Sequence, residues 1–371
     1  MRTAIISDYP EEGWFSMDLC AQMLTQTWDV EQGWQAKQIC PSFQRRFTQL
    51  PQFGTRRIAL NGDRLLNRFW DYPRYVRQIA HQFDVFHVCD HTYAQLVHEL
   101  PADRTGVYCH DLDAFRSILE PDQEPRPHWY RTMSQRILDG LQKAAIVFYS
   151  TATVRAQLEQ YRLVKLDRLI QAPLGVAPEF TSYSSINPNL LKQLEQCSFL
   201  LHVGSCIPRK RIDVLLDSFA QLHRCHSQLR LVKVGGEFTH EQHQQIDRLG
   251  IRSNIIHYQN LSRTEIAALY RQAAIVLLPS EAEGFGLPLI EALSCGAIVV
   301  ASDLPVFREI ANDAALYCAV GNVADWVETV TAVLNDPHHA PERSRRLTQA
   351  NRYSWQTHTA AISQAYHQLN R

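Results

Sequence analysis

The sequence between residues 273 and 305 reads AAIVLLPSEAEGFGLPLIEALSCGAIVVASDLP, which indicates a strand, a loop, a helix and a second strand. Both ends are unbroken apolar runs, as expected of strands that are buried on two faces. Pro288 fits the first turn of a helix, where its missing N–H costs nothing, and Gly296 fits the left-handed position that follows a helix. This stretch therefore predicts one strand–helix–strand unit of a parallel sheet.

Similar apolar runs recur along the chain and alternate with helical patterns. They fall into two groups, and each group predicts a parallel sheet covered by helices on both faces. We therefore predict an α/β protein with two Rossmann-like, doubly wound domains. The predicted strands are residues 3–7, 84–89, 104–109 and 144–150 in the first half, and residues 198–204, 229–235, 254–259, 273–280 and 296–302 in the second.

The boundary between the two domains is expected in the segment 174–190, which carries proline, serine and asparagine without a clear period. We assign residues 1–178 to an N-terminal Rossmann-like domain and residues 179–352 to a C-terminal one. Residues from about 342 to 369 are expected to form one long helix. Its end, about residues 353–371, is expected to pack back on the first domain.

Composition excludes several classes of protein. The formal net charge of −1 argues against a general nucleic-acid binder, which usually carries a basic excess. Nine scattered cysteines without a C-x-x-C pair indicate free thiols in a reducing compartment. The first residues are too polar for a signal peptide, and no apolar run approaches the roughly 20 residues that span a bilayer. We expect a cytoplasmic protein.

Two glutamates in the opening stretch, Glu283 and Glu291, lie on either side of a Gly-Phe-Gly turn. The amides of Phe285, Gly286 and Leu287 would face an anion at the positive end of the helix. Carboxylates on both sides of an anion site suit a nucleotide-sugar, which has hydroxyls on both sides of its diphosphate. The alternative is that both glutamates only stabilise the start of the helix.

Several motifs in the same order resemble those of the retaining glycosyltransferases called family 4. These enzymes have the GT-B fold, which implies that residues 1–178 form an acceptor domain and residues 179–352 a nucleotide-sugar donor domain, the two facing a central cleft. The likeness covers most of the chain and is strongest from about 198 to 311. The motifs are EGFGLPLIEALSCGAIVVASDLPVFREI, LHVGSCIPRKRIDVLLDSFAQL, HYQNLSRTEIAALYRQA, QAPLGVAPEF and YCHDLDAF. The resemblance implies a retaining enzyme that moves a sugar from a nucleotide-diphosphate-sugar to an acceptor hydroxyl.

The resemblance also implies roles for residues of the second half. Lys210 matches the lysine that binds the diphosphate, with Arg209 as its companion. Glu291 would bind the ribose and Glu283 the sugar hydroxyls, and Asn260 or Leu261 would lie near the base. The glycine-containing loop at Gly204 departs from the pattern, because Ser205 stands where many members have arginine.

In the first half, His110 matches the histidine that lies against the transferred sugar, although a hydrogen-bonded core histidine is the alternative. Asp111 begins a D-x-D string that resembles a manganese motif of another glycosyltransferase fold. We interpret it as a coincidence and expect no metal or other cofactor. Gly13, Trp14 and Ser16 occupy the place of the family's first loop and, with Asp111, are candidates for the acceptor side. A core position is the default for the aromatic residue at 14.

Eight arginines and two aspartates give residues 41–80 a net charge of +6, with aromatic residues between them. The arginines from 45 to 77 fit either peripheral contact with anionic lipid on the cytoplasmic membrane face or a solvated surface. The acceptor could be a glycan, a lipid-linked sugar or a small molecule. Two alternatives to a transferase stay open: a catalytically silent subunit that binds nucleotide-sugar, and a sugar-nucleotide epimerase of the same fold.

Overall fold

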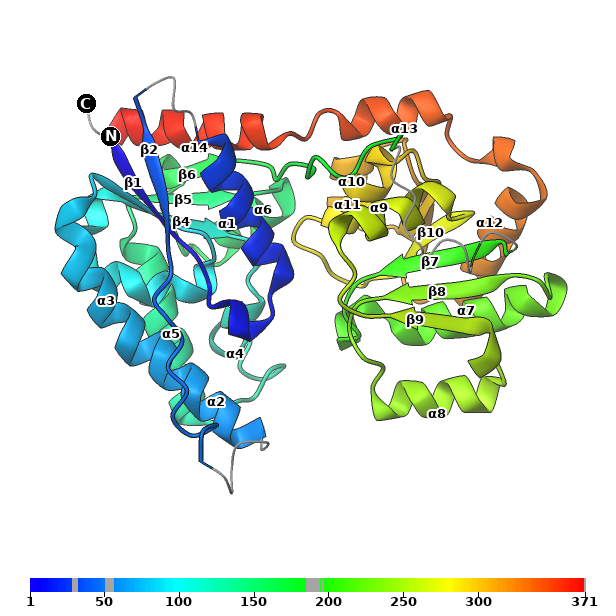
Figure 1. The fold of residues 1–371 in the computed structure, drawn as a ribbon, viewed down its shortest axis with the longest axis horizontal. Helices are drawn as coiled ribbons and strands as arrows, with labels where there is room; N and C mark the ends of the chain where they lie inside the picture. Colours follow the sequence, from blue (N-terminus) through cyan, green and yellow to red (C-terminus); the bar gives the residue numbers. More distant parts are fainter. Residues whose placement is uncertain (29–32, 51–56, 185–193, 195–196, 370–371) are drawn as a thin grey trace. The chain divides into compact units, whose positions relative to one another are not determined.

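The chain divides into two units in the computed structural model (Figure 1). The structure describes residues 1–371 except 29–32, 51–56, 185–193, 195–196 and 370–371. Unit 1 comprises Met1–Gly175 and Trp355–Arg371, and unit 2 comprises Val176–Ser354. Each unit has its own parallel sheet and its own buried apolar core.

The sheet of unit 1 has six parallel strands in the order β2-β1-β3-β4-β5-β6. Ile6 of β1 pairs with Ile39 of β2 on one side and with Val88 of β3 on the other. The central strands are fully buried, as their unbroken apolar sequences predict. The bounds are β1 Arg2–Ile6, β2 Gln35–Ile39, β3 Val85–Val88, β4 Thr105–Cys109, β5 Ile146–Tyr149 and β6 Leu169–Gln171.

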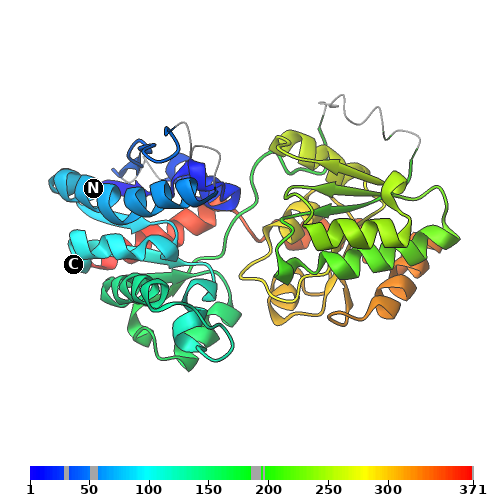
Figure 2. The same ribbon diagram turned by 90° about the horizontal axis from the view of Figure 1, so that it is seen from below.

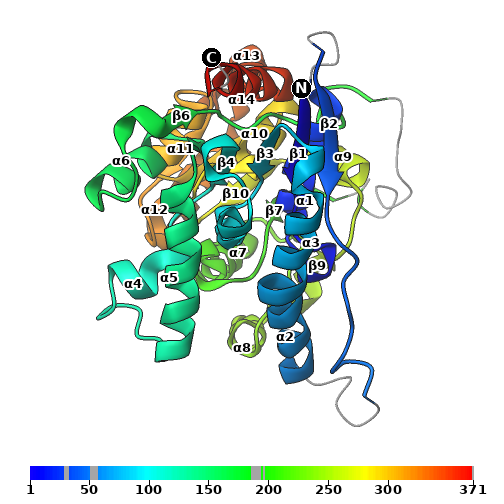
Figure 3. The same cartoon turned by 90° about the vertical axis from the view of Figure 1, so that its left-hand side faces the viewer.

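The helices of unit 1 include α2, a π-helical segment (Asn67–Asp71) and α3, which follow one another as one rod (Figure 3). A 3-10 segment, His91–Glu99, packs against α5 so closely that a Cβ on Gly140 would lie 2.0 Å from the carbonyl oxygen of Ala94. The α-helices are α1 Phe15–Thr27, α2 Arg57–Leu66, α3 Tyr72–Ile79, α4 Arg116–Leu119, α5 His128–Lys143, α6 Ala152–Gln160 and α14 Trp355–Leu369.

The sheet of unit 2 also has six parallel strands, in the order β12-β11-β10-β7-β8-β9. Its strands are β7 Phe199–Val203, β8 Arg230–Val234, β9 Ile255–Tyr258, β10 Ile275–Leu278, β11 Val299–Ser302 and β12 Leu316–Cys318. Its helices are α7 Ile212–Cys225, α8 His240–Leu249, α9 Arg263–Gln272, α10 Leu287–Ser294, α11 Pro305–Ala311, α12 Val323–Asn335 and α13 Arg343–Ala350. The predicted doubly wound α/β architecture is confirmed.

Local sequence accounts for where several helices of unit 2 begin. Ser262 and Glu265 form a capping box at the start of α9, each satisfying the other's backbone amide. Pro288 lies in the first turn of α10, and Gly296 follows that helix with φ 79°, as the opening stretch predicts. These residues fix where the helices begin and end, and so they fix the loops between strands and helices.

The expectation of one long C-terminal helix is wrong. The chain leaves the helical path after Ala350, so that α13 belongs to unit 2 and α14 to unit 1. Tyr366 of α14 is buried in unit 1, where its hydroxyl donates to the carbonyl of Phe86 on β3 (2.8 Å). Figure 2 shows the red α14 among the elements of residues 1–175. In the described part of the chain, no helix is both long and apolar enough to cross a bilayer.

Candidate functional site

The loop that follows β10 carries the residues between Ser280 and Gly286. Gly286 begins α10 with φ 95°, a left-handed conformation that favours glycine, and a Cβ there would lie 2.7 Å from the ring of Phe307. Phe285 is buried and meets the ring of Tyr353 edge-on at 5.7 Å. The tight turn therefore needs the small residue, and it fixes the start of α10 at Leu287.

Glu283 lies between two cations from the loop after β7. Lys210 Nζ is 2.5 Å from Glu283 Oε1, and Arg209 Nη1 is 3.2 Å from Glu283 Oε2. The hydroxyl of Ser280 donates to Oε1 (2.7 Å). Burial works to raise the pKa of Glu283, but the charges of Lys210 and Arg209 outweigh it and hold the pKa below its ordinary value. The carboxylate is therefore ionised and holds both cations at one place.

Glu291 lies one turn into α10 and is 8% exposed. The hydroxyl of Tyr270, on α9, donates to its Oε2 at 3.4 Å. Burial raises the pKa of Glu291 to about 7, against the lowering effects of the Tyr270 hydrogen bond and the Arg263 charge. Arg263 is itself paired with Glu179 at 3.0 Å. The second carboxyl of the predicted site is thus buried and only half ionised near neutral pH.

Four further predicted residues lie where β7 and β9 end. Gly204 follows β7, and its amide donates to Val234 O (3.0 Å) at the end of the neighbouring strand. Ser205 continues that loop, ahead of the 3-10 turn Pro208–Lys210 that carries the two cations. Asn260, with φ 55°, and Leu261 follow β9 and precede α9. Unit 2 therefore gathers the predicted donor residues in loops at the carboxyl ends of β7, β9 and β10, where parallel sheets bind ligands.

Two of the predicted residues of unit 1, His110 and Asp111, lie in the loop after β4. His110 follows β4, and its Nε2–H donates to Cys89 O (2.8 Å), while its amide donates to Nδ1 of His91 (3.3 Å). Burial lowers the pKa of His110, so the ring is neutral at physiological pH. Asp111 accepts the amide of Asp113 (3.1 Å) and lies 3.7 Å from His91 Nε2. Within the described ranges, no group of three or more His, Cys, Asp or Glu is arranged to hold a metal ion.

Trp14 is 56% exposed, so the default core position for this aromatic residue is wrong. It precedes α1, next to Gly13, whose φ of 75° ends a 3-10 turn, and Ser16 in the first turn of α1 is also exposed. The physical reason is that the side chain lies at the cap of a helix, outside its apolar face.

Sequence reasoning passed over three residues that the structure brings to these loops. Tyr270 and Ser280 hydrogen-bond to the two glutamates; Tyr270 lies within the motif HYQNLSRTEIAALYRQA and Ser280 at the end of a predicted strand, but no local pattern distinguishes their hydroxyls. Lys233 was detectable, because it is an isolated lysine within the apolar strand LRLVKVG (229–235). It is fully buried beneath the loop that carries Gly204.

Two exposed arginines of the segment 45–77 have partners within the segment itself. Arg46 makes a two-pronged pair with Asp71 (2.8 and 2.9 Å), and the Arg74 guanidinium lies 3.5 Å from the centre of the Trp70 ring. Arg56 lies outside the described residues.

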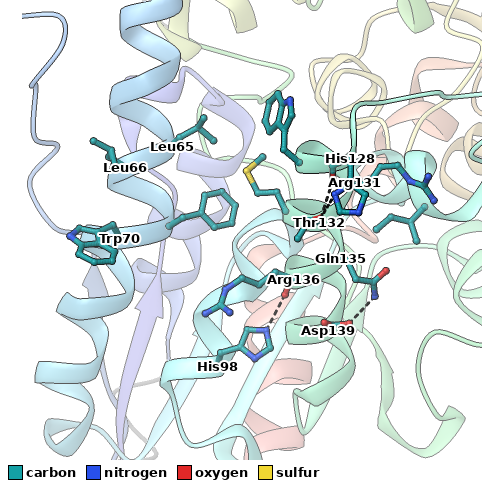
Figure 4. Close-up of a pocket in the computed structure, with 14 residues that line it drawn as sticks. Leu65, Leu66, Trp70, His98, His128, Arg131, Thr132, Gln135, Arg136 and Asp139 are labelled. Carbon is teal, nitrogen blue, oxygen red and sulfur yellow. Dashed lines mark hydrogen bonds between the residues drawn. The ribbon is translucent and has the colours of Figure 1, made fainter.

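A hollow of about 960 Å³ lies beside this segment, between the rod of α2 and the helix α5 (Figure 4). Its walls are largely apolar, with Leu65, Leu66 and Trp70 on one side and Trp129 and Met133 on the other. Trp70 and Trp129 are 54% and 60% exposed.

Comparison with known proteins identifies the family. Residues 190–353 match the model for glycosyl transferases group 1. The O-antigen chain mannosyltransferase B of Escherichia coli is 27% identical over 272 residues, which are 71% of this chain and 70% of that protein. The chain covers only 33% of the longer serotype-specific mannosyltransferase WbdA of the same organism, at 25% identity.

Solved structures agree on the fold. Sucrose-phosphate synthase from Thermosynechococcus elongatus superposes with a TM-score of 0.76 at 18% identity, covering 100% of this chain and 99% of that one. HepE from Anabaena, in complex with UDP, gives 0.71 at 18% identity and covers 98% and 99%. Residues 190–353 therefore form a region of the glycosyl transferases group 1 family, and the chain has the GT-B fold, as the motifs predict.

Proposed function

We propose that this chain is a retaining transferase that moves a sugar from a nucleotide-diphosphate-sugar, bound on unit 2, to an acceptor hydroxyl. The observation that carries the proposal is the cluster of Glu283, Arg209 and Lys210 beside the glycine turn at the start of α10. Cations and helix-terminal amides stabilise the diphosphate whose charge grows as the glycosidic bond breaks.

The two carboxyls then take different roles. Glu291, one turn inside α10, accepts hydrogen bonds from the ribose hydroxyls, and Asn260 or Leu261 lies near the base. Glu283 accepts hydrogen bonds from the sugar while it keeps Lys210 and Arg209 in place for the diphosphate. HepE is described in complex with UDP, which supports a nucleotide diphosphate as the donor's leaving group.

The reaction would proceed by attack on the same face from which the leaving group departs. The acceptor oxygen bonds to the anomeric carbon as the bond from that carbon to the phosphate breaks, and the proton of the acceptor passes to the departing phosphate. Neutral His110, with its Nε2–H committed to Cys89 O, offers its ring against the transferred sugar. Gly13, Trp14, Ser16 and Asp111 are proposed for the acceptor side.

A calorimetric panel of UDP-, GDP- and ADP-sugars on the wild type and on Glu291→Ala tests the donor site. We expect one preferred nucleotide, with binding lost in the variant. Binding without transfer or slow hydrolysis would favour a silent subunit, and conversion of the donor without an acceptor would favour an epimerase. A folded wild-type protein that binds no nucleotide-sugar would refute the proposal.

We propose anionic lipid as a peripheral contact of unit 1, through the segment 45–77 and the hollow beside it. The exposed Trp70 and Trp129, next to Leu65 and Leu66, support this, because aromatic and apolar side chains with nearby arginines suit a membrane interface. Such contact would suit a lipid-linked acceptor, although the relative's description as an O-antigen chain transferase also supports a glycan. Sedimentation with anionic and with neutral vesicles is the test. Equal recovery with both, at low salt, would contradict the proposal.

A further inference from the structure

Lys233 is a buried cation at the carboxyl end of β8. Its side chain is fully buried, and its Nζ donates to the carbonyl oxygens of Gly204 (2.7 Å) and Val234 (3.0 Å). Gly204 follows β7 and begins the loop with Ser205 that leads to Arg209 and Lys210. The ammonium group therefore lies directly beneath the loop proposed to hold the diphosphate.

No carboxylate of the described residues neutralises this charge. The groups that act on it are the thiol of Cys206 and the ammonium of Lys210, which has the same sign. In the sheet, Lys233 is flanked in register by His202 and His257, and both rings bond to backbone carbonyls. A buried ammonium without an anionic partner is costly, and a buried ionisable group of this kind beside ligand-binding loops is a candidate for a functional role.

The loops after β7 and β8 are packed so closely that no side chain fits between them at Gly235 and Gly236. A Cβ on Gly235 would lie 2.7 Å from Gly204 O, and a Cβ on Gly236 would lie 2.8 Å from the amide nitrogen of Cys206. The loop after β7 therefore rests directly on the loop after β8. Ser205, whose backbone lies against Gly236 at this contact, contributes no charge of its own.

We propose that Lys233 is a positioning residue for the donor: it holds the Gly204 loop by its carbonyl and supplies, from beneath, positive charge for the diphosphate. This inference rests on the proposed function and extends it, because it assigns part of the diphosphate's electrostatic binding to the strand β8 as well as to the loop cations. It acts through the loop and does not touch the reacting atoms.

The proposal links diphosphate binding to proton uptake. Burial, with the like charge of Lys210 adding to it, lowers the pKa of Lys233 to about 8 in the unliganded protein. A bound diphosphate favours the charged ammonium and therefore raises this pKa, and by linkage the charged form binds the diphosphate more tightly. At pH 8, where half of the Lys233 groups are neutral, binding should take up about half a proton per site.

The experiment is calorimetry with UDP, GDP and ADP at pH 7 and pH 8, in buffers with different heats of ionisation. The terminal phosphate of the nucleotide has its second pKa at about 6, so at pH 8 the nucleotide itself adds little to the proton uptake. The variants are Lys233→Met, which removes the charge, and Lys233→Arg, which keeps a charge that does not titrate. Arg230→Met, at the other end of the same strand, is the matched control.

For the nucleotide that the wild type binds, we expect proton uptake of about half a proton at pH 8, roughly tenfold weaker binding by Lys233→Met at pH 7, and no uptake in either Lys233 variant. Arg230→Met should behave as wild type. Absence of uptake in the wild type, or unchanged affinity and uptake in Lys233→Met, would overturn the inference while leaving the proposed function intact. If Lys233→Met does not fold, the wild-type uptake and Lys233→Arg decide. No nucleotide binding by the wild type would overturn both.

Discussion

Replacing Glu291 by glutamine should make the protein more stable and a poorer binder of nucleotide. The pKa of Glu291 is about 7 in the folded protein against an ordinary 4.5, because burial disfavours the charge. Between these values the unfolded carboxyl has lost its proton and the folded one has kept it, so stability falls as the pH rises from 4.5 to 7. Above pH 7 the wild type has lost about 3 kcal/mol of its free energy of unfolding, because each pH unit between the two pKa values contributes about 1.4 kcal/mol.

Glutamine cannot ionise, so Glu291→Gln should escape this penalty. At pH 8 the melting temperature of unit 2 should rise by roughly 6 to 12 °C, since about 1 kcal/mol shifts a domain of this size by about 2–4 °C. At pH 4.5, where the wild-type carboxyl is protonated, the two proteins should melt alike. A hydrogen bond from the ribose to a carboxylate contributes about 1.5–3 kcal/mol, and the glutamine would forfeit this contribution. Nucleotide binding at pH 8 should therefore weaken by roughly 10- to 150-fold.

The assay is thermal unfolding at pH 4.5, 6, 7 and 8, followed by nucleotide titration at pH 8. Glu281→Gln is the matched control, because its carboxylate is exposed in the preceding loop and its loss should change neither quantity. Stabilisation of Glu291→Gln by the same amount at every pH would refute the reasoning, since it would not come from ionisation. Unchanged nucleotide affinity would remove Glu291 from the donor site.

Glu283→Gln should lower turnover by well over tenfold in a folded protein, because it releases the two cations; a transfer assay with circular dichroism as the folding control checks this, and wild-type rates would contradict it. Gly286→Ala should weaken nucleotide binding, because φ 95° and the Phe307 ring oppose a Cβ; undiminished affinity by calorimetry would show that the turn adapts. Gly106→Ala should destabilise unit 1 by roughly 2 kcal/mol or more, because its Cβ would overlap the Tyr366 hydroxyl, and urea unfolding at wild-type midpoint would contradict this.

The strands that could be predicted from sequence are mostly those buried within the sheets. Three strands were not predicted: β2, β6 and β12, and all three are edge strands. An edge strand is covered less completely and needs no unbroken apolar run, as the sequence QAKQI of β2 illustrates. The interior strands carry the apolar signal because both of their faces must be covered.

The types of site residue could also be predicted, but not their mutual contacts. Spacing placed Glu283 and Glu291 around a helix start, and the structure has them there. The ion pair of Glu283 with Lys210 joins residues 73 positions apart, and the partner of Glu291, Tyr270, lies 21 positions away. Contacts of this length depend on how loops from different strands meet, so no local pattern contains them. The half-ionised state of Glu291 depends in turn on its burial.

The assignment of α14 to unit 1 has a consequence for biosynthesis. The ribosome delivers residues 1–175 first, yet the helix that buries Tyr366 against β3 and Gly106 is made only after all of unit 2. Residues 1–175 must therefore wait without the cover that α14 provides while all of unit 2 is synthesised. During that interval the exposed apolar surface is a target for chaperones, and a premature stop codon near residue 350 would damage the half of the protein that was translated first.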